Sequence, residues 1–208
     1  MVLLLNAEQR IVFQALVDWS CKCATEDHIA PFYIFCTGGA GVDKTHLIKT
    51  ITQMLFRTVI KPGDNPTATV ALLCAPTGTA AYNIGGTTLR SAFHVPLGEA
   101  NIDANLSSEK LNCLRNKYSQ LKCLIMDEIS MVGATTLANV HQRLQEIKGI
   151  GLTTEKPFGA VSNLAVGDLE QLPPVCDEPV YGMSHDALYG FAYLFNSNFS
   201  VFYLTEIM

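Results

Sequence analysis

The stretch "FYIFCTGGAGVDKTHL", residues 32–47, decides the fold class of this chain. An apolar run typical of a buried strand leads into a glycine-rich loop, and apolar residues at helical spacing follow. Residues 38–45 keep the pattern G-x-x-x-x-G-K-[ST], except that Asp43 stands where the second glycine belongs. Backbone N–H groups of such a loop converge on phosphate oxygens, and the helix N-terminus adds positive potential. A strand and an amphipathic helix around the glycines favour a phosphate-binding loop over a chance tight turn.

Strands and helices alternate along the rest of the chain. Helix 7–22, with Asn6 as its cap and Glu8 near its start, precedes a series of expected strands at 32–37, 69–75, 122–128 and 161–166. Between them we expect helices at 45–59, 79–84, 107–120 and 135–148, with loops at 61–68 and 94–106. This order predicts an α/β domain with a mostly parallel sheet covered on both faces, and ligands bound at the carboxyl ends of the strands.

Composition limits the class of protein. A chain of 208 residues that is 49% hydrophobic suits one domain, which we divide into an N-terminal helix, 1–30, and a core, 31–208. Seven scattered cysteines, an odd number, favour reduced, buried thiols inside a cell, and Cys21 and Cys23 lack the partners of a zinc site. We expect neither a secretory signal nor a membrane span. The net charge of −5 argues against nucleic acid, but all 14 Lys and Arg residues lie between Arg10 and Lys156.

Three segments carry residues suited to nucleotide chemistry. In the loop, Lys44 would reach the β- and γ-phosphates of a nucleotide, and the Thr45 hydroxyl would hold Mg²⁺. Asp127 ends the strand of "LIMDEIS", where it could face the metal, and Glu128 could activate water. In "VGDLEQLPPV", Asp168 and Gln171 project from a loop stiffened by prolines, and an uncharged amide can sense a γ-phosphate without repelling it. Together these segments indicate a nucleoside triphosphatase core.

Seven segments, in order and spacing, resemble the Pif family of DNA helicases: "LNAEQ", "GGAGVDKT", "APTGTAA", "GGTTLRSAFHVPL", "LIMDEISMV", "KPFGAVSNLAVGDLEQLPPV" and "LTEIM". These are superfamily-one motors related to RecD, and the resemblance covers essentially the whole chain. It implies a RecA-like P-loop NTPase domain, the first motor domain of an ATP-dependent helicase that moves 5′ to 3′ along single-stranded DNA. ATP and Mg²⁺ are the implied cofactors.

The resemblance also assigns roles to residues. Lys44, Asp127, Glu128 and Gln171 are implied to be catalytic, with Thr45 and Asp127 on Mg²⁺ and Gln9 on the adenine edge. The implied ATP-binding set is Gln9, Gly38, Gly39, Ala40, Gly41, Val42, Asp43, Lys44, Thr45 and His46. The implied DNA-binding set is Pro76, Thr77, Gly78, Thr87, Arg90, Ser91, Phe93 and His94. Phe93 is either a base-stacking surface or a core aromatic.

Four positions depart from the family pattern. Arg90 replaces a histidine, Ala160 a glycine and Leu169 an aromatic, and these changes are compatible with function. Asp43 is the one change expected to impair function. A side chain there obstructs the loop. Its charge would also repel the phosphates, by about 3 kcal/mol for each pair of like charges at ~5 Å. Pairing with Lys44 would relieve the charge but would take the lysine from the phosphate. We therefore expect weak ATP binding.

The resemblance implies partners as well. Single-stranded DNA and forked duplex are the expected substrates of a monomeric protein, in the nucleus or mitochondrion, with DNA repair, recombination and telomere maintenance as family settings. A second RecA-like domain, with an arginine finger, is absent from this chain, so we expect a fragment that cannot unwind DNA alone. The alternative is a degenerate helicase-derived module that binds DNA or protein without turnover. A nucleotide kinase is disfavoured, because "APTGTAA" and "GDLEQLPPV" would have no task in it.

Overall fold

The fold is built on a six-stranded parallel sheet. The computed structural model describes residues 2–26, 29–60, 68–95, 106–151, 155–182 and 192–207, so most of the expected loops 61–68 and 94–106 lies outside the described residues. The strand order is β3-β2-β4-β5-β1-β6, and every neighbouring pair is parallel. The strands are β1 (Tyr33–Gly38), β2 (Ala71–Ala75), β3 (Thr87–Thr88), β4 (Cys123–Met126), β5 (Ser162–Gly167) and β6 (Ser200–Leu204). The predicted α/β class with a parallel sheet is confirmed.

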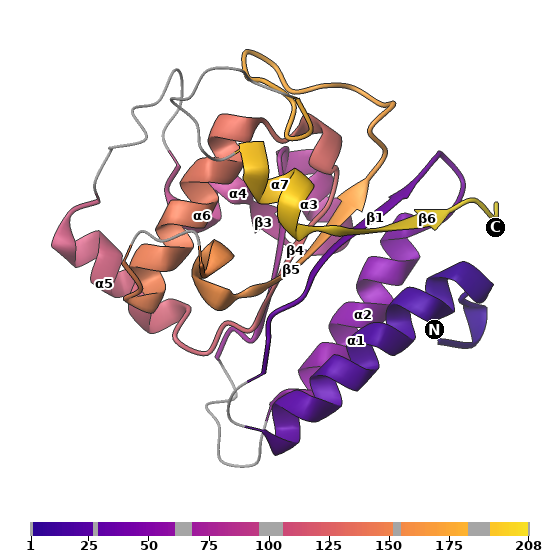
Figure 1. The fold of residues 1–208 in the computed structure, drawn as a ribbon, viewed down its shortest axis with the longest axis horizontal. Coiled ribbons are helices and arrows are strands. Elements are labelled where there is room, and N and C mark those ends of the chain that lie inside the picture. Colours follow the sequence, from indigo (N-terminus) through magenta and orange to yellow (C-terminus); the bar gives the residue numbers. More distant parts are fainter. Residues whose placement is uncertain are drawn as a thin grey trace.

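Helices cover both faces of this sheet (Figure 1). One face carries α1 (Ala7–Thr25), α2 (Lys44–Thr58) and α3 (Gly78–Ile84). The other carries α4 (Leu89–Phe93), α5 (Ser108–Lys117), α6 (Ala134–Lys148) and α7 (Ala192–Asn198). Three 3₁₀ turns complete the described elements: η1 (Val2–Leu4), η2 (Ile129–Met131) and η3 (Pro157–Ala160). None of the described helices is both long and apolar enough to cross a membrane.

Each face of the sheet has its own core, because successive side chains of a strand point to opposite faces. In β1, Ile34 and Cys36 belong to the core under α1 and α2, whereas Phe35 belongs to the core under α6 and α7. The central strands β4 and β5 are buried at every position. β4 is an unbroken apolar run, as expected of a strand covered on both sides, whereas β5 begins with the buried polar residues Ser162 and Asn163.

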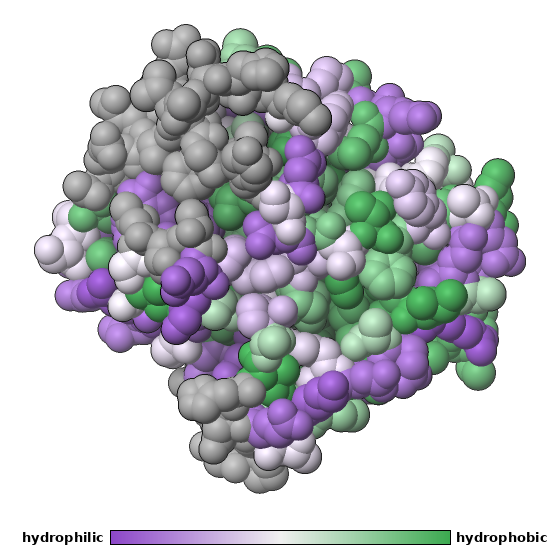
Figure 2. Space-filling model, viewed as in Figure 1, coloured by the Kyte–Doolittle hydropathy of each residue, from purple (hydrophilic) through white to green (hydrophobic). Residues whose placement is uncertain are grey.

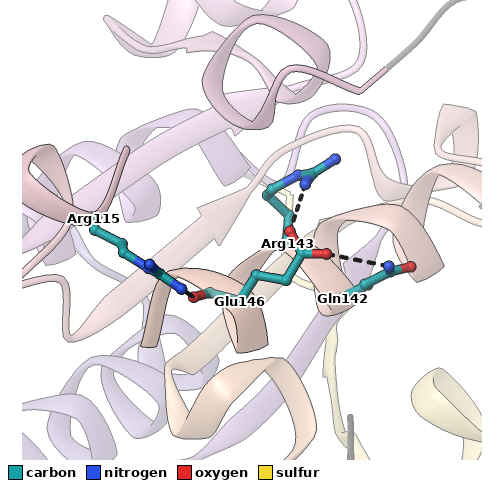
Figure 3. A network of polar contacts seen from close by, with 4 residues as sticks. All are labelled: Arg115, Gln142, Arg143 and Glu146. Atoms are coloured by element: carbon teal, nitrogen blue, oxygen red, sulfur yellow. Dashed lines mark hydrogen bonds and ion pairs between the residues drawn. The ribbon is translucent and has the colours of Figure 1, made fainter. Parts of the chain in front are cut away.

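The surface of the molecule mixes hydrophilic and hydrophobic residues in the view of Figure 2. On the α6 face, the helices are joined by a small polar network around Glu146 (Figure 3). The Arg115 guanidinium of α5 donates to the Glu146 carbonyl oxygen at 3.1 and 3.2 Å. The Glu146 carboxylate accepts from Gln142 at 3.2 Å and pairs with Arg143. The Gly149 N–H donates to the same carbonyl at 3.2 Å, so Arg115 adds a second donor to this group in the last turn of α6.

The expected elements are found with shifts of a few residues, and the structure adds others. The capping box of α1 confirms Asn6 as its cap, since Asn6 accepts from the Gln9 N–H at 2.8 Å. The edge strands β3 and β6 and the short helices α4 and α7 were not predicted, because each is short and carries little periodic signal. None of the seven cysteines, all of which are described, forms a disulfide. Only Cys36, Cys74 and Cys123 are buried, so the prediction of buried thiols was wrong for the exposed Cys21, Cys113 and Cys176.

Candidate functional site

The glycine-rich loop lies between the carboxyl end of β1 and the first turn of α2. Gly41 has a φ of +88°, and Asp43 has a φ of +47° in the left-handed region. Asp tolerates this region better than most residues, so the loop adopts at position 43 a backbone conformation that glycine would adopt without strain. The Lys44 ammonium donates to the carbonyls of Gly38 and Gly39 at 2.7 and 2.9 Å, which folds the lysine over the loop.

The side chain of Asp43 caps α2. Its carboxylate accepts a hydrogen bond from the His46 N–H at 3.2 Å, at the helix end where an anion is stabilised. Asp43 and Lys44, both described, form no ion pair, so the suggested pairing between them was wrong. The carboxylate instead uses one of the N–H groups that a phosphate-binding loop offers to its ligand.

Gln9 lies against this loop from the side of α1. Its side chain is fully buried, its Nε2 donates to the Val42 carbonyl at 2.9 Å, and its Oε1 accepts from the Asn6 N–H at 3.3 Å. Both ends of the amide are therefore in use within the protein. The residue that the resemblance places on the adenine edge holds the loop to the N-terminal helix.

The segment "LTEIM" also reaches this region, a contact that sequence reasoning missed. Glu8 accepts hydrogen bonds from the Thr205 hydroxyl and from the N–H groups of Thr205 and Glu206. The Thr205 hydroxyl, followed by these N–H groups, lowers the pKa of the Glu8 carboxyl. A Cβ added to Gly38 would lie 2.5 Å from the Leu204 carbonyl oxygen, so β6 can approach the loop only because position 38 is glycine.

Asp127 and Glu128 follow β4 at the same edge of the sheet. Burial raises the pKa of the Asp127 carboxyl to about 6. The Glu128 carboxylate adds to the rise, whereas the Glu128 N–H, which donates to Asp127 at 3.0 Å, and the Lys44 ammonium oppose it. β4 and β1 are both parallel to β5, so the acidic pair and the glycine-rich loop lie at the same edge of the sheet.

Gln171 lies on the loop that follows β5, the strand between β4 and β1. Its N–H donates to the Asp168 carbonyl, and its Nε2 donates to the Asp168 carboxylate, both at 3.1 Å. A Cβ on Gly167 would lie 2.9 Å from the Ile129 nitrogen, so glycine at the end of β5 allows the chain after Asp127 to pass closely. The segments of Glu128 and Gln171 are therefore neighbours.

The two residues expected to hold Mg²⁺ offer one carboxylate, Asp127, and one hydroxyl, Thr45. Mg²⁺ prefers oxygen ligands and is usually bound by one or two carboxylates together with substrate phosphates. Asp127 is 6% exposed, and one of its oxygens accepts from Glu128. The chemistry of these two donors fits a metal that arrives with a nucleotide.

The residues expected to contact DNA follow β2 and β3 at the same edge. The Thr77 hydroxyl caps α3 through Ala80 N–H at 3.2 Å, and the Thr88 hydroxyl caps α4 through Ser91 N–H at 3.1 Å. The other expected contacts with some exposed surface are Pro76, Gly78, Thr87, Arg90, Ser91 and His94. β4 and β5 separate β2 from β1, which corresponds to about 14 Å between strand axes at ~4.8 Å per strand.

Two aromatic residues of this region lie differently from the expectation. Phe93 is fully buried and its ring packs 5.9 Å from that of Tyr118, so Phe93 is a core aromatic and its stacking role was wrong. Tyr82 is 85% exposed on α3. Helical spacing could have found it, because Ala81 and Ile84 mark the buried face and Tyr82 lies on the opposite one, with Gly78 and Thr79.

A parallel sheet with a glycine-rich loop, a lysine, an acidic pair and a polar loop at the carboxyl ends of β1, β4 and β5 defines a P-loop NTPase domain of the RecA-like kind. The family model described as PIF1-like helicase matches residues 4–208. The chain belongs to the PIF1-like helicase family.

Known relatives agree with this membership. The chain is 34% identical over 160 residues to an "ATP-dependent DNA helicase PIF1" of Emericella nidulans, covering 76% of this chain and 20% of that protein. It resembles the structure described as "DNA Unwinding at Forked dsDNA by two coordinating Pif1 helicases", with 29% identity, a TM-score of 0.68, and coverage of 99% of this chain and 44% of that one. The chain is also similar to a Bacteroides Pif1 helicase solved with ADP-AlF3 and ssDNA. The sequence identity is 29%, the TM-score is 0.64, and the match covers 99% of this chain and 43% of that one. The chain thus spans a fifth of the curated relative and under half of each solved chain.

Proposed function

We propose that this chain is an ATP-binding motor domain of a helicase that moves 5′ to 3′ along single-stranded DNA and unwinds forked duplex. The observation that carries the proposal is that β1, β5 and β4 are neighbouring parallel strands, which puts the loops of Lys44, Gln171 and Asp127 at one edge of the sheet. The solved relative that holds both ADP-AlF3 and ssDNA supports it. A monomer acting in the nucleus or mitochondrion, in DNA repair, recombination or telomere maintenance, belongs to the same proposal.

Each residue has a task in this proposal. Lys44 would exchange the carbonyls of Gly38 and Gly39 for phosphate oxygens of ATP. Thr45 and Asp127 would hold Mg²⁺, which neutralises charge on the phosphates when bound. Glu128 would orient and deprotonate the attacking water, and Gln171 would sense the γ-phosphate. Pro76, Thr77 and Gly78 would hold a DNA phosphate.

Asp43 makes nucleotide binding weak in this proposal. Its carboxylate already accepts from the His46 N–H, so an incoming phosphate would compete with it and be repelled by it. Repulsion of about 3 kcal/mol per like-charge pair corresponds to a loss of affinity of roughly two orders of magnitude. Turnover would also require a second RecA-like domain, whose arginine would stabilise charge in the cleft between the two domains.

Titration of Mg²⁺ and a fluorescent ATP analogue into this chain and its Asp43→Gly variant tests the nucleotide site. We expect the variant to bind about a hundredfold more tightly. Equal affinities would defeat the role of Asp43, and a variant that fails to bind at all would defeat the nucleotide site. Single-strand-DNA-stimulated ATPase activity of a protein that contains both motor domains, measured with and without the Asp43→Gly substitution, tests the motor.

A degenerate module without turnover is the second candidate function. The hydrogen bond between the Asp43 carboxylate and the His46 N–H favours it, because the loop then stabilises itself without a ligand. This candidate requires that the chain bind single-stranded DNA while ATPase activity stays absent after Asp43→Gly in the two-domain protein. Activity in that protein would exclude it.

A further inference from the structure

Helix α6 receives its N-terminal cap from a residue far away in the sequence. Its own cap position, Gly133, provides no side-chain hydrogen bond. The Asp177 carboxylate accepts from the Thr135 N–H at 3.2 Å, from the Thr136 N–H at 3.3 Å and from the Thr136 hydroxyl at 3.4 Å. Asp177 thus provides the acceptor for N–H groups that the first turn of a helix leaves without an internal partner.

The contact is closely fitted on both sides. A Cβ on Gly133 would lie 2.0 Å from the Asp177 carboxyl carbon, so only glycine leaves room for the carboxylate. The Ala134 N–H donates to the Glu178 carbonyl at 2.7 Å, and Gly133 forms an isolated antiparallel bridge with Pro179. Side-chain and backbone contacts together join residues 133–136 to residues 177–179.

Each of these two segments is continuous in sequence with one part of the proposed site. Upstream of Gly133, the single turn η2 separates it from Glu128. Upstream of Asp177, the loop carries Gln171, and residues 170–173 are exposed. The hydrogen bonds of Gln171 run to Asp168 within the same loop. The far end of the loop is held by Asp177 and by Val180, which is 2% exposed.

We propose that Asp177 is a positioning residue for hydrolysis, which fixes the Gln171 loop relative to Glu128 by fastening both to the N-terminus of α6. This inference rests on the proposed function and adds a residue to it. A γ-phosphate would contact Gln171 and Glu128 at the same time only while the Asp177 hydrogen bonds to α6 are formed. A ligand without a γ-phosphate does not depend on it.

The test compares Mg²⁺-AMP-PNP with Mg²⁺-ADP in the 208-residue chain carrying Asp43→Gly, by displacement of a fluorescent ADP analogue. We expect Asp177→Ala to lower the preference for AMP-PNP over ADP about fivefold, while the ADP dissociation constant stays within about twofold. Asp177→Asn, which retains one acceptor oxygen, should fall between. Glu178→Ala is the matched control, because it removes the neighbouring charge while the Glu178 carbonyl keeps its bond to Ala134.

Thermal unfolding of each variant separates positioning from loss of fold, and Thr136→Val gives a milder second variant if Asp177→Ala does not fold. A preference that is unchanged, or an equal weakening of both ligands, overturns the inference while leaving the nucleotide site standing. A parent that binds both ligands equally also overturns it, since no γ-phosphate contact then exists to be positioned. A parent that binds neither ligand overturns the proposed function as well.

Discussion

The Gln9 side chain of α1 donates a hydrogen bond to the Val42 carbonyl of the phosphate-binding loop at 2.9 Å, in a fully buried contact. The same amide accepts from Asn6, so it joins the helix cap to the loop. Gln9 therefore acts on the nucleotide site through the backbone. An adenine contact would require its amide to leave at least one of these partners.

Gln9→Ala separates the two roles. The substitution leaves the buried Val42 carbonyl without its donor, which should cost about 1–3 kcal/mol of stability. In the Asp43→Gly background, a positioning role predicts equal weakening of ATP and GTP binding. An adenine-reading role predicts a loss confined to ATP, so parallel titrations with the two nucleotides distinguish them.

Asp43→Asn separates charge from obstruction at the loop. An asparagine also tolerates the left-handed conformation seen at φ +47° and can accept from the His46 N–H. If charge is the main obstacle, the Asp43→Asn variant should recover most of the affinity that the Asp43→Gly variant recovers. Affinity as low as that of the original chain would show that the side chain itself blocks the phosphate.

Ala160→Gly should stabilise the protein. Phe158, Gly159 and Ala160 have consecutive φ values of +53°, +62° and +60°, and Ala160 is exposed. Removing the Cβ should gain about 1 kcal/mol and raise the unfolding temperature by roughly 2–4 °C. The matched control is Gly159→Ala. Its added Cβ would lie 2.6 Å from the Leu144 carbonyl oxygen, so this substitution should destabilise the protein. Calorimetry that finds no gain for Ala160→Gly would contradict strain at this turn.

The same turn makes stability depend on pH through His141. Its Nδ1 accepts from the Phe158 N–H at 2.9 Å, and burial lowers the pKa of His141 to about 4. The unfolded chain, with a His pKa near ~6.5, binds more protons between these values, so stability falls as pH falls from about 6.5 to 4. Between pH 7.5 and 5, His141 alone should lower the free energy of unfolding by about 2 kcal/mol.

His141→Asn isolates this contribution, because the side-chain oxygen of an asparagine can accept from Phe158 without taking up a proton. Asp127 acts in the opposite sense, since its pKa is raised to about 6 and its folded form gains a proton below that pH. The Asp127 contribution is common to both proteins, so the His141 effect is the difference between them. On going from pH 7.5 to 5, denaturant unfolding should show that the original chain loses about 2 kcal/mol relative to His141→Asn. An identical pH profile in the two proteins would exclude His141 as the cause.

Tyr82 is expected to contact single-stranded DNA. It is 85% exposed on α3, and side chains on a helix lean toward its N-terminus, here toward Gly78 and Thr79. Tyr82→Ala should weaken binding of an oligonucleotide by about 1–3 kcal/mol, as for loss of one stacked base, without changing stability. Phe93→Ala, in the core, should instead destabilise the fold by about 3–5 kcal/mol. Unchanged oligonucleotide affinity in Tyr82→Ala would remove it from the DNA surface.

Local patterns in the sequence were sufficient to predict the central strands, the glycine-rich loop before α2 and the acidic pair after β4. Unbroken apolar runs mark strands buried on both faces, and glycines followed by Lys44 mark a loop before a helix. A parallel sheet brings its carboxyl ends to one edge, so the presence of Lys44 and Asp127 at the same edge also followed from sequence.

Tertiary structure alone decided how single side chains are used. From sequence, Asp43 could either pair with Lys44 or cap α2. In the structure Lys44 donates to the Gly38 and Gly39 carbonyls, and Asp43 caps the helix. Phe93 lies in the five-residue helix α4, which is too short to show a periodic pattern, so only the packing of that helix shows that its ring is buried. Asp177 reaches α6 across a long stretch of chain, and no local periodicity encodes such a contact.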